Sequence, residues 1–243
     1  MIKKKNILGV GITNATKEDI LEYIIKSLEN FKKKYFIVTP NPEFLVLADK
    51  NHDFKDILNK AELASADGVG VIIAGKILGK PLKVRFTGID LVKSLCKRVA
   101  ASNAAGAEKP ITVGFLGGRS GVAEKTAECL RKKHPELKVN FVGEEWPKDH
   151  FGRLSHVADD AQLQKFENQS LNSASLSKSR LQSGTKPTFN SSASGQAPSI
   201  NNIDILFVAF GAPKQEFWIN ENLDKIPVKI AIGVGGAFDY ISG

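Results

Sequence analysis

Along this chain, short continuous runs of apolar residues alternate with stretches in which apolar residues recur every three or four positions. The runs have the length and composition of buried strands, and the periodic stretches have the spacing of amphipathic helices. The predicted strands are Ile7–Ile12, Tyr35–Val38, Glu62–Ala66, Ile111–Leu116, Val139–Val142, Ile203–Phe210 and Val228–Val234. Continuous apolar strands separated by helices are typical of a mostly parallel sheet covered by helices on both faces, so we predict an α/β fold.

Capping residues mark the start of two predicted helices. Thr16 is followed three residues later by Asp19, which is the spacing of a capping box. Asn41 stands directly before Pro42, a residue that suits the first position of a helix. The other expected helices run from the turn at 67–70 through residue 78, over 88–101, over 122–133 and from the loop at 211–216. Loops that directly follow predicted strands therefore lead into most of these helices.

Residues 167–202 differ from the rest of the chain. They contain ten serines together with scattered Asn, Gln, Gly and Pro, and they show no apolar periodicity. Such a segment buries too little apolar surface to offset the entropy lost when it becomes ordered. We predict a flexible insertion within a single domain that spans residues 1–243, with a set of short strands as the alternative.

The composition is that of a globular protein. Of the 243 residues, 42% are hydrophobic and 25% are charged, which allows a substantial core and excludes a chain that is disordered throughout. No apolar run approaches the ~18 residues of a membrane-spanning helix, and a glycine-rich stretch follows the basic N-terminus where a signal peptide would have its apolar core. Two cysteines, Cys96 and Cys129, allow neither a disulfide framework nor a four-thiolate zinc site. We expect a cytoplasmic protein.

The formal net charge of +8 suits nucleic acid, an anionic lipid surface or a phosphorylated substrate as a partner. Aromatic residues are not interleaved with the basic clusters, as binding to single-stranded nucleic acid would require. We therefore expect no nucleic-acid partner.

Polar residues in the loops after predicted strands are the first candidates for chemistry, because ligands of open parallel sheets bind beyond the carboxyl ends of the strands. Asp67 follows a strand of small and apolar residues and precedes Gly68, a position from which a carboxylate can act as general base on a hydroxyl. It can also simply cap the following helix. Thr39 and Asn41 are candidate hydrogen-bonding groups for a substrate, or else turn and cap residues.

The glycine-rich loop at 114–121 is a candidate phosphate site. Backbone N–H groups around Gly117 and Gly118, at the start of a helix, can bind an anion, although tight turning is an equally good reason for these glycines. The loop lacks the Lys-Ser/Thr ending of a nucleoside-triphosphate loop, and Gly9-Val10-Gly11 lacks the third glycine of a dinucleotide fingerprint. The expected Rossmann-like sheet therefore carries neither standard nucleotide motif.

Other polar residues flank the same predicted edge. Arg85 offers forked donors to a diphosphate, or forms an ion pair with a nearby carboxylate. Gln215 follows a Gly-Ala-Pro turn, where it faces either a ligand or the helix surface, and Gly235 and Asp239 follow the last predicted strand. The chain has no Asp-x-Asp sequence, the metal-binding pair that is familiar from sugar-nucleotide enzymes.

Six motifs, taken in order, resemble those of the WecG/TagA/CpsF family of bacterial glycosyltransferases. They are Thr39-Pro40-Asn41-Pro42-Glu43, Ala66-Asp67-Gly68-Val69-Gly70, Arg85-Phe86-Thr87-Gly88-Ile89-Asp90-Leu91, Gly114-Phe115-Leu116-Gly117-Gly118, Phe210-Gly211-Ala212-Pro213-Lys214-Gln215-Glu216 and Gly233-Val234-Gly235-Gly236-Ala237-Phe238-Asp239. Each motif alone is weak, but six in the order of the family are specific. They cover nearly the whole chain outside the serine-rich segment.

The resemblance implies an inverting transfer of an N-acetylmannosamine-type sugar, or a related hexose, from a UDP-sugar to polyprenyl-diphosphate-linked N-acetylglucosamine. It places the enzyme peripherally at the inner face of the cell membrane, in the synthesis of teichoic acid or another surface polysaccharide, with no metal, no cofactor and a possible homo-oligomer. Asp67 matches the proposed general base, and Thr39 and Gln215 match residues of the active pocket. The other residues that we expect to bind substrate are Asn41, Arg85, Gly117, Gly118, Gly235 and Asp239.

The resemblance also implies a C-terminal segment, basic and aromatic, that follows the Gly-Ala-Phe-Asp motif, approaches the membrane and contributes arginines to the active site. This sequence ends at Gly243. We therefore expect the chain to lack that segment, to bind UDP and to turn over slowly. Two other readings stay open: a nucleotide-sugar-binding module without catalysis, and an NAD-dependent oxidoreductase, which the incomplete fingerprint disfavours.

Overall fold

A computed structural model of the protein describes residues 2–30, 32–146 and 202–243. The predicted insertion at 167–202 lies outside the described residues, apart from residue 202. The elements, in chain order, are β1 (Lys4–Ile7), β2 (Val10–Thr13), α1 (Lys17–Ser27), β3 (Tyr35–Val38), α2 (Pro42–Lys50), α3 (His52–Lys60), β4 (Leu63–Ala64), α4 (Val69–Ile77), α5 (Gly88–Ala104), β5 (Thr112–Gly117), α6 (Val122–Lys133), β6 (Lys138–Gly143), β7 (Ile203–Ala209), α8 (Lys214–Asn222), the 3₁₀ turn η1 (Leu223–Lys225), β8 (Val228–Gly233) and α9 (Ala237–Ser242).

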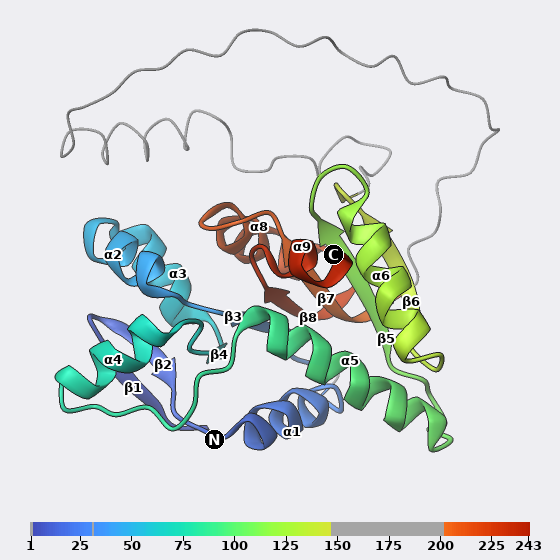
Figure 1. The fold of residues 1–243 in the computed structure, drawn as a ribbon, viewed down its shortest axis with the longest axis horizontal. Coiled ribbons are helices and arrows are strands. Elements are labelled where there is room, and N and C mark those ends of the chain that lie inside the picture. Colours follow the sequence, from blue (N-terminus) through green and yellow to red (C-terminus); the bar gives the residue numbers. More distant parts are fainter. Residues whose placement is uncertain (1, 31, 147–201) are drawn as a thin grey trace, which may run out of the picture. The chain divides into compact units, whose positions relative to one another are not determined.

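The central sheet has six strands in the order β4-β3-β8-β7-β5-β6, and every neighbouring pair is parallel (Figure 1). Its register places Leu206 of β7 opposite both Gly114 of β5 and Ala231 of β8. Because all strands run the same way, their carboxyl ends, and the loops that follow them, lie at one edge of the sheet. The predicted α/β fold with a mostly parallel sheet is confirmed.

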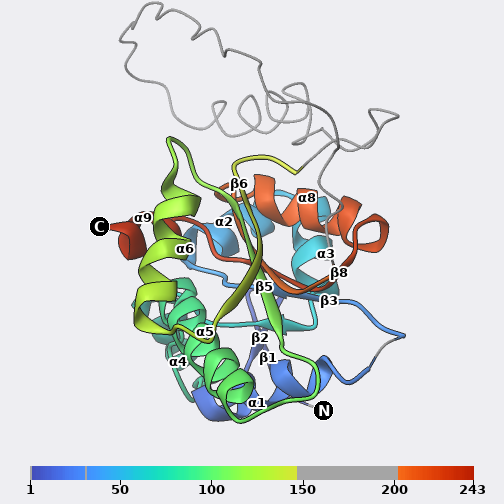
Figure 2. The same ribbon diagram turned by 90° about the vertical axis from the view of Figure 1, so that its right-hand side faces the viewer.

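Helices cover both faces of this sheet (Figure 2). Alternate strand residues, such as Ile37, Phe115 and Phe207, belong to one buried cluster with apolar residues of α1, α5, α6 and α9. The helices α2, α3 and α8 carry a separate row of neighbouring rings, in which the Phe54 ring is tilted against Phe44 at 5.6 Å and stacked on Phe217 at 6.1 Å between centroids. Burial of the sheet on both sides explains why its strands are continuous apolar runs.

The predicted strand Ile7–Ile12 is wrong. The structure divides this segment between β1 and β2, an antiparallel hairpin that forms a sheet of its own. The turn residues Leu8 and Gly9 have φ of 50° and 86°, the left-handed conformation of a tight hairpin turn, and Asn6 Oδ1 accepts a hydrogen bond from the Gly9 N–H. Leucine is an unusual residue at that φ, so the turn could not be predicted from its residue types.

Both predicted caps are confirmed. Thr16 Oγ1 accepts from the Asp19 N–H, and Asp19 Oδ2 accepts from the Thr16 N–H, which completes the capping box of α1. Asn41 Oδ1 accepts from the Phe44 N–H at 3.0 Å and caps α2. Asn41 therefore has a structural role at the start of a helix.

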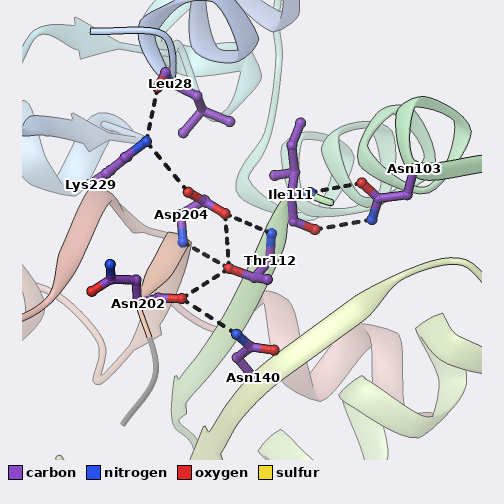
Figure 3. A network of polar contacts seen from close by, with 8 residues as sticks. All are labelled: Leu28, Asn103, Ile111, Thr112, Asn140, Asn202, Asp204 and Lys229. Carbon is purple, nitrogen blue, oxygen red and sulfur yellow. Dashed lines mark hydrogen bonds and ion pairs between the residues drawn. The ribbon is translucent and has the colours of Figure 1, made fainter. Parts of the chain in front are cut away.

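A polar network closes the amino ends of three central strands (Figure 3). Asp204 of β7, 6% exposed, accepts from both the N–H and the hydroxyl of Thr112 at the start of β5, each at 2.9 Å. Lys229 of β8 lies 3.7 Å from the other Asp204 oxygen and donates to the Leu28 carbonyl. Because the motif loops follow the carboxyl ends of the same strands, this network lies at the opposite edge of the sheet.

Candidate active site

Backbone hydrogen bonds join the loops at the carboxyl edge. The Ser65 N–H, after β4, donates to Val38 of β3, and the Val234 N–H, after β8, donates to Val208 of β7. The Gly118 N–H, after β5, donates to the Ala209 carbonyl at 3.1 Å. These bonds connect the strand ends of β4 and β3, and those of β8, β7 and β5. The Thr39 hydroxyl, which donates to the Gly233 carbonyl, joins the two groups into one rim on which the motif residues lie.

Asp67 lies on this rim between β4 and α4 and is half-buried. Its Oδ2 accepts from the Gly88 N–H at 2.8 Å, and its own N–H donates to the Pro40 carbonyl at 2.8 Å. The alternative that Asp67 caps the following helix is wrong, because the N-cap of α4 is Gly68 and no side chain of the described residues caps that helix by a hydrogen bond. Asp67 instead binds the first residue of α5, which is 21 positions further along the chain.

The environment of Asp67 makes its carboxylate more basic than an ordinary one. Burial raises the pKa, while the Gly88 hydrogen bond and the positive charge of Arg85 lower it and the negative charge of Asp90 raises it, with a net shift upward. In the described part of the chain the second oxygen, Oδ1, has no hydrogen-bond partner. One oxygen is thus fixed by the backbone, and the other is free to accept a proton from a ligand.

Gly88 links Asp67 to the loop after β8. A Cβ atom at Gly88 would lie 2.8 Å from the Val234 carbonyl oxygen. Only glycine, which has no Cβ, lets the start of α5 approach that loop so closely. Thr87, directly before it, caps α5 through the Asp90 N–H. The Arg85-Phe86-Thr87-Gly88 motif therefore holds the N-terminus of α5 against the Asp67 carboxylate.

Thr39 is buried at the end of β3, with 4% of its surface exposed. Its hydroxyl donates to the Gly233 carbonyl at the end of β8, at 2.9 Å. The side chain thus joins two neighbouring strand ends directly below the rim.

Gln215 and Glu216 form a fully buried pair at the start of α8, each 0% exposed. Gln215 Nε2 donates to Glu216 Oε1 at 2.7 Å, and Gln215 Oε1 accepts from the Gly235 N–H at 3.0 Å. A Cβ atom at Gly233 would lie 2.9 Å from Glu216 Oε1, so both side chains lie against the end of β8. The alternative that Gln215 lies on the helix surface is wrong.

Glu216 is a residue of this site that the sequence did not single out. Burial is the largest cause that raises its pKa to about 8, against smaller lowering effects of the Gln215 hydrogen bond and of the Glu216 backbone N–H. The carboxyl is therefore mostly protonated at neutral pH. Its Oε2 is buried without a hydrogen-bond partner among the described residues, which is uncommon for a buried polar atom.

The loop after β5 borders a cavity of about 300 Å³ that is lined by Gly118, Arg119, Glu144, Glu145, Ala209, Phe210 and Lys214. Gly117 has a φ of 105°, and a Cβ atom there would lie 2.7 Å from the Ala209 carbonyl oxygen, so this turn requires glycine. Glu144 Oε1 accepts from the Gly121 N–H at 2.9 Å. A side-chain carboxylate thus already binds one of the amides that were candidates for a phosphate.

Two predicted site residues stand apart from the hydrogen-bonded cluster. Arg85 is exposed and is connected to Asp67 through its charge, and Asp239 is exposed in the first turn of α9. Their roles as substrate-binding residues remain predictions.

A larger cavity, of about 610 Å³, lies beside α1 and is lined by Ile2, Lys3, Asn14, Ala15, Asp19, Glu22, Tyr23, Lys26 and Lys83. It contains none of the predicted site residues, so size alone does not identify the site. Within the described ranges, no three His, Cys, Asp or Glu residues are grouped so that they could hold a metal ion. No helix in those ranges is long and apolar enough to cross a membrane.

Three bacterial relatives of the chain carry the same name. An N-acetylglucosaminyldiphosphoundecaprenol N-acetyl-beta-D-mannosaminyltransferase of Bacillus spizizenii is 28% identical over 211 residues, which are 87% of this chain and 63% of the relative. Proteins of the same name from Staphylococcus aureus strains MRSA252 and NCTC 8325 are 27% and 26% identical over 241 residues, which are 99% of this chain and 76% of each relative. The chain thus spans about two thirds to three quarters of the length of these relatives.

The model of a single protein family matches residues 5–162 and 187–243. The match includes all six motifs of the rim, from Thr39 to Asp239, and covers most of the chain. The chain belongs to the glycosyl transferase WecG/TagA/CpsF family.

Proposed function

We propose that this protein transfers an N-acetylmannosamine-type sugar, with inversion, from a UDP-sugar to polyprenyl-diphosphate-linked N-acetylglucosamine. The relatives are named for this sugar and for an N-acetylglucosaminyldiphosphoundecaprenol acceptor. The observation that carries the proposal to this chain is the state of Asp67: a half-buried carboxylate at the strand edge, with one oxygen bound to Gly88 and the other open.

In this mechanism Asp67 Oδ1 takes the proton from the attacking hydroxyl of the acceptor sugar. The hydroxyl oxygen forms a bond to the anomeric carbon while the bond from that carbon to the UDP oxygen breaks, and its electron pair leaves with UDP. Attack from the face opposite UDP inverts the configuration. The raised pKa strengthens the base, and the Gly88 hydrogen bond holds the carboxylate in one orientation.

The charge that develops on UDP needs positive or N–H donor groups. Arg119 and Lys214 line the cavity beside the loop after β5, and Arg85 lies on the Asp67 side of the rim. We assign the diphosphate to the region between them, where forked guanidinium donors suit phosphate oxygens. The buried pair Gln215–Glu216 fixes the loop at Gly235 below it.

The lipid-linked acceptor requires the enzyme to work at a membrane surface. We propose a peripheral location at the inner face of the cell membrane, in the synthesis of teichoic acid or another cell-surface polysaccharide. The excess of positive charge, +8 in formal terms, favours contact with anionic lipids.

The test is a UDP-release assay with the full chain, a panel of UDP-sugars and a short-chain prenyl-diphosphate-linked N-acetylglucosamine. We expect UDP release only when the acceptor is present, fastest with UDP-N-acetylmannosamine, and a product with inverted anomeric configuration by NMR. Binding of UDP without acceptor-dependent release would instead support the non-catalytic binding module.

A further inference from the structure

The outer face of α4 is apolar. Four of the seven large hydrophobic side chains that are exposed in the described residues lie on this helix or its C-cap: Val69, Ile73, Ile77 and Leu78, with 55%, 51%, 79% and 43% of their surface exposed. The first three are spaced by four residues, so they form one stripe along the helix. A surface helix normally turns polar residues to water, so this stripe needs a partner.

The opposite side of α4 is already occupied. Val71 and Gly75 are buried, and a Cβ atom at Gly75 would lie 3.4 Å from Leu82 and 3.5 Å from Ile7 of the hairpin. The helix is therefore held to the body of the protein by its inner face. The exposed stripe is left over for a contact outside the described fold.

The segment that contains α4, between Asp67 and Asp90, is basic. Residues 68–89 contain Lys76, Lys80, Lys83 and Arg85 and no Asp or Glu. Lys76 and Lys80 are exposed, and neither forms a salt bridge with a carboxylate of the described residues. Lysines beside an aliphatic stripe are the features of helices that lie in the interface of an anionic membrane, where the stems lie along apolar surface and the ammonium groups reach phosphate.

A second copy of the chain fits this face less well. A two-fold contact would place the same patch on both sides and would bring its lysines together without a balancing carboxylate. Anionic lipid headgroups carry negative charge, so they can pair with these lysines without bringing like charges together.

We propose that the outer face of α4, formed by Val69, Ile73, Ile77 and Leu78 with Lys76 and Lys80, docks the protein on an anionic lipid bilayer. Helix α4 begins two residues after Asp67, so this contact brings the candidate base close to the lipid surface. The inference rests on the proposed function in one respect, the lipid anchor of the acceptor. A docked α4 explains how a sugar that is held close to the bilayer reaches Asp67.

The experiment is co-sedimentation of the full 243-residue chain with vesicles of phosphatidylcholine alone or mixed with phosphatidylglycerol. We expect binding to the mixed vesicles that weakens as salt is raised. The variant Ile73→Gln/Ile77→Gln should lose about tenfold or more in vesicle affinity because two aliphatic side chains no longer leave water. The variant Lys76→Gln/Lys80→Gln should lose about tenfold or more on the mixed vesicles alone.

Matched controls are Tyr240→Gln, which removes an apolar side chain that is 74% exposed on α9, and Lys132→Gln/Lys133→Gln, which removes two cations at the end of α6. Both controls should bind vesicles like the original chain. Unchanged vesicle binding of the α4 variants, equal losses in the controls, or no binding of the original chain to the mixed vesicles overturns the proposal. A dimer in sedimentation that Ile73→Gln/Ile77→Gln converts to a monomer assigns the face to a second copy instead.

Failure of the membrane-docking proposal can be distinguished from failure of the proposed function. With the short-chain acceptor in solution, the α4 variants should release UDP at the rate of the original chain, since Ile73, Ile77, Lys76 and Lys80 are not among the residues assigned to catalysis or substrate binding. With the acceptor embedded in mixed vesicles, they should be about tenfold slower. Absence of UDP release from the original chain in both assays refutes the proposed function, whereas the vesicle-binding result stands by itself.

Discussion

Replacement of Glu216 by glutamine should remove a pH dependence that this buried carboxyl imposes on folding stability. Glu216 is 0% exposed, and burial raises its pKa from the ordinary 4.5 to about 8. Between these two values the folded chain keeps the proton and the unfolded chain releases it. The free energy of unfolding therefore falls as the pH rises through this window, and the contribution of Glu216 is fully present below pH 4.5 and lost above about pH 8.

The size of the effect follows from the same values. Each pH unit within the window costs about 1.36 kcal/mol, so the whole shift corresponds to about 5 kcal/mol. Glutamine has the same shape, has no proton to lose, and keeps an oxygen that can accept from Gln215 Nε2. The difference in unfolding free energy between Glu216→Gln and the original chain should therefore grow, in favour of the variant, from pH 5 to pH 8 and stay constant above.

The assay is urea unfolding of both chains at intervals of one pH unit from 5 to 9. Glu221→Gln is the matched control, because it makes the same substitution at an exposed position of the same helix. Parallel stability curves for Glu216→Gln and the original chain between pH 5 and 8 would refute the reasoning, since the carboxyl would then ionise in the folded chain as it does in the unfolded one.

Three further substitutions test the geometry of the site and its frame. Gly88→Ala should lower the free energy of unfolding by about 1–3 kcal/mol in urea, because its Cβ would lie 2.8 Å from the Val234 carbonyl oxygen, whereas Gly236→Ala, with no atom nearer than 3.7 Å, should not. Asp204→Ala should cost about 1–3 kcal/mol by leaving the Thr112 donors unpaired, yet leave the rate of UDP release unchanged; a slower rate would contradict its placement at the far edge. Asn41→Ala should cost about 1 kcal/mol in thermal unfolding, and Asn41→Asp should restore it, since both acids and amides cap helices; equal stability of the alanine variant would exclude the cap.

The strands were predictable because burial on both faces makes each one a continuous apolar run. The predicted Tyr35–Val38 matches β3 at both ends, and the helix over 122–133 matches α6. The caps at Thr16 and Asn41 were predictable for a different reason: they depend on residues only three positions away, so the whole interaction is visible in the sequence.

Two helices were missed. Helix α3 has a local pattern that could have revealed it, with Asn51 as cap and Phe54, Ile57 and Leu58 on one buried face. Helix α9 has six residues, which is too short for a periodic pattern to emerge.

Most residues of the site were predictable from the sequence, but the hydrogen bonds between them were not. The sequence placed Asp67 after a strand, whereas its partner Gly88 is 21 residues away and comes into reach only through the fold. Glu216 was passed over because a charged residue at the start of a helix is normally exposed. Only the packing of α8 against the end of β8 reveals that this carboxyl is buried beside Gln215.

The most direct measurement of the central claim is the turnover of Asp67→Asn in the UDP-release assay, together with its affinity for UDP and its thermal unfolding. Asparagine keeps the oxygen that accepts from Gly88 but cannot take a proton. We predict turnover at least about a hundredfold lower, with UDP affinity and folding unchanged. Turnover close to that of the original chain would show that Asp67 is not the base.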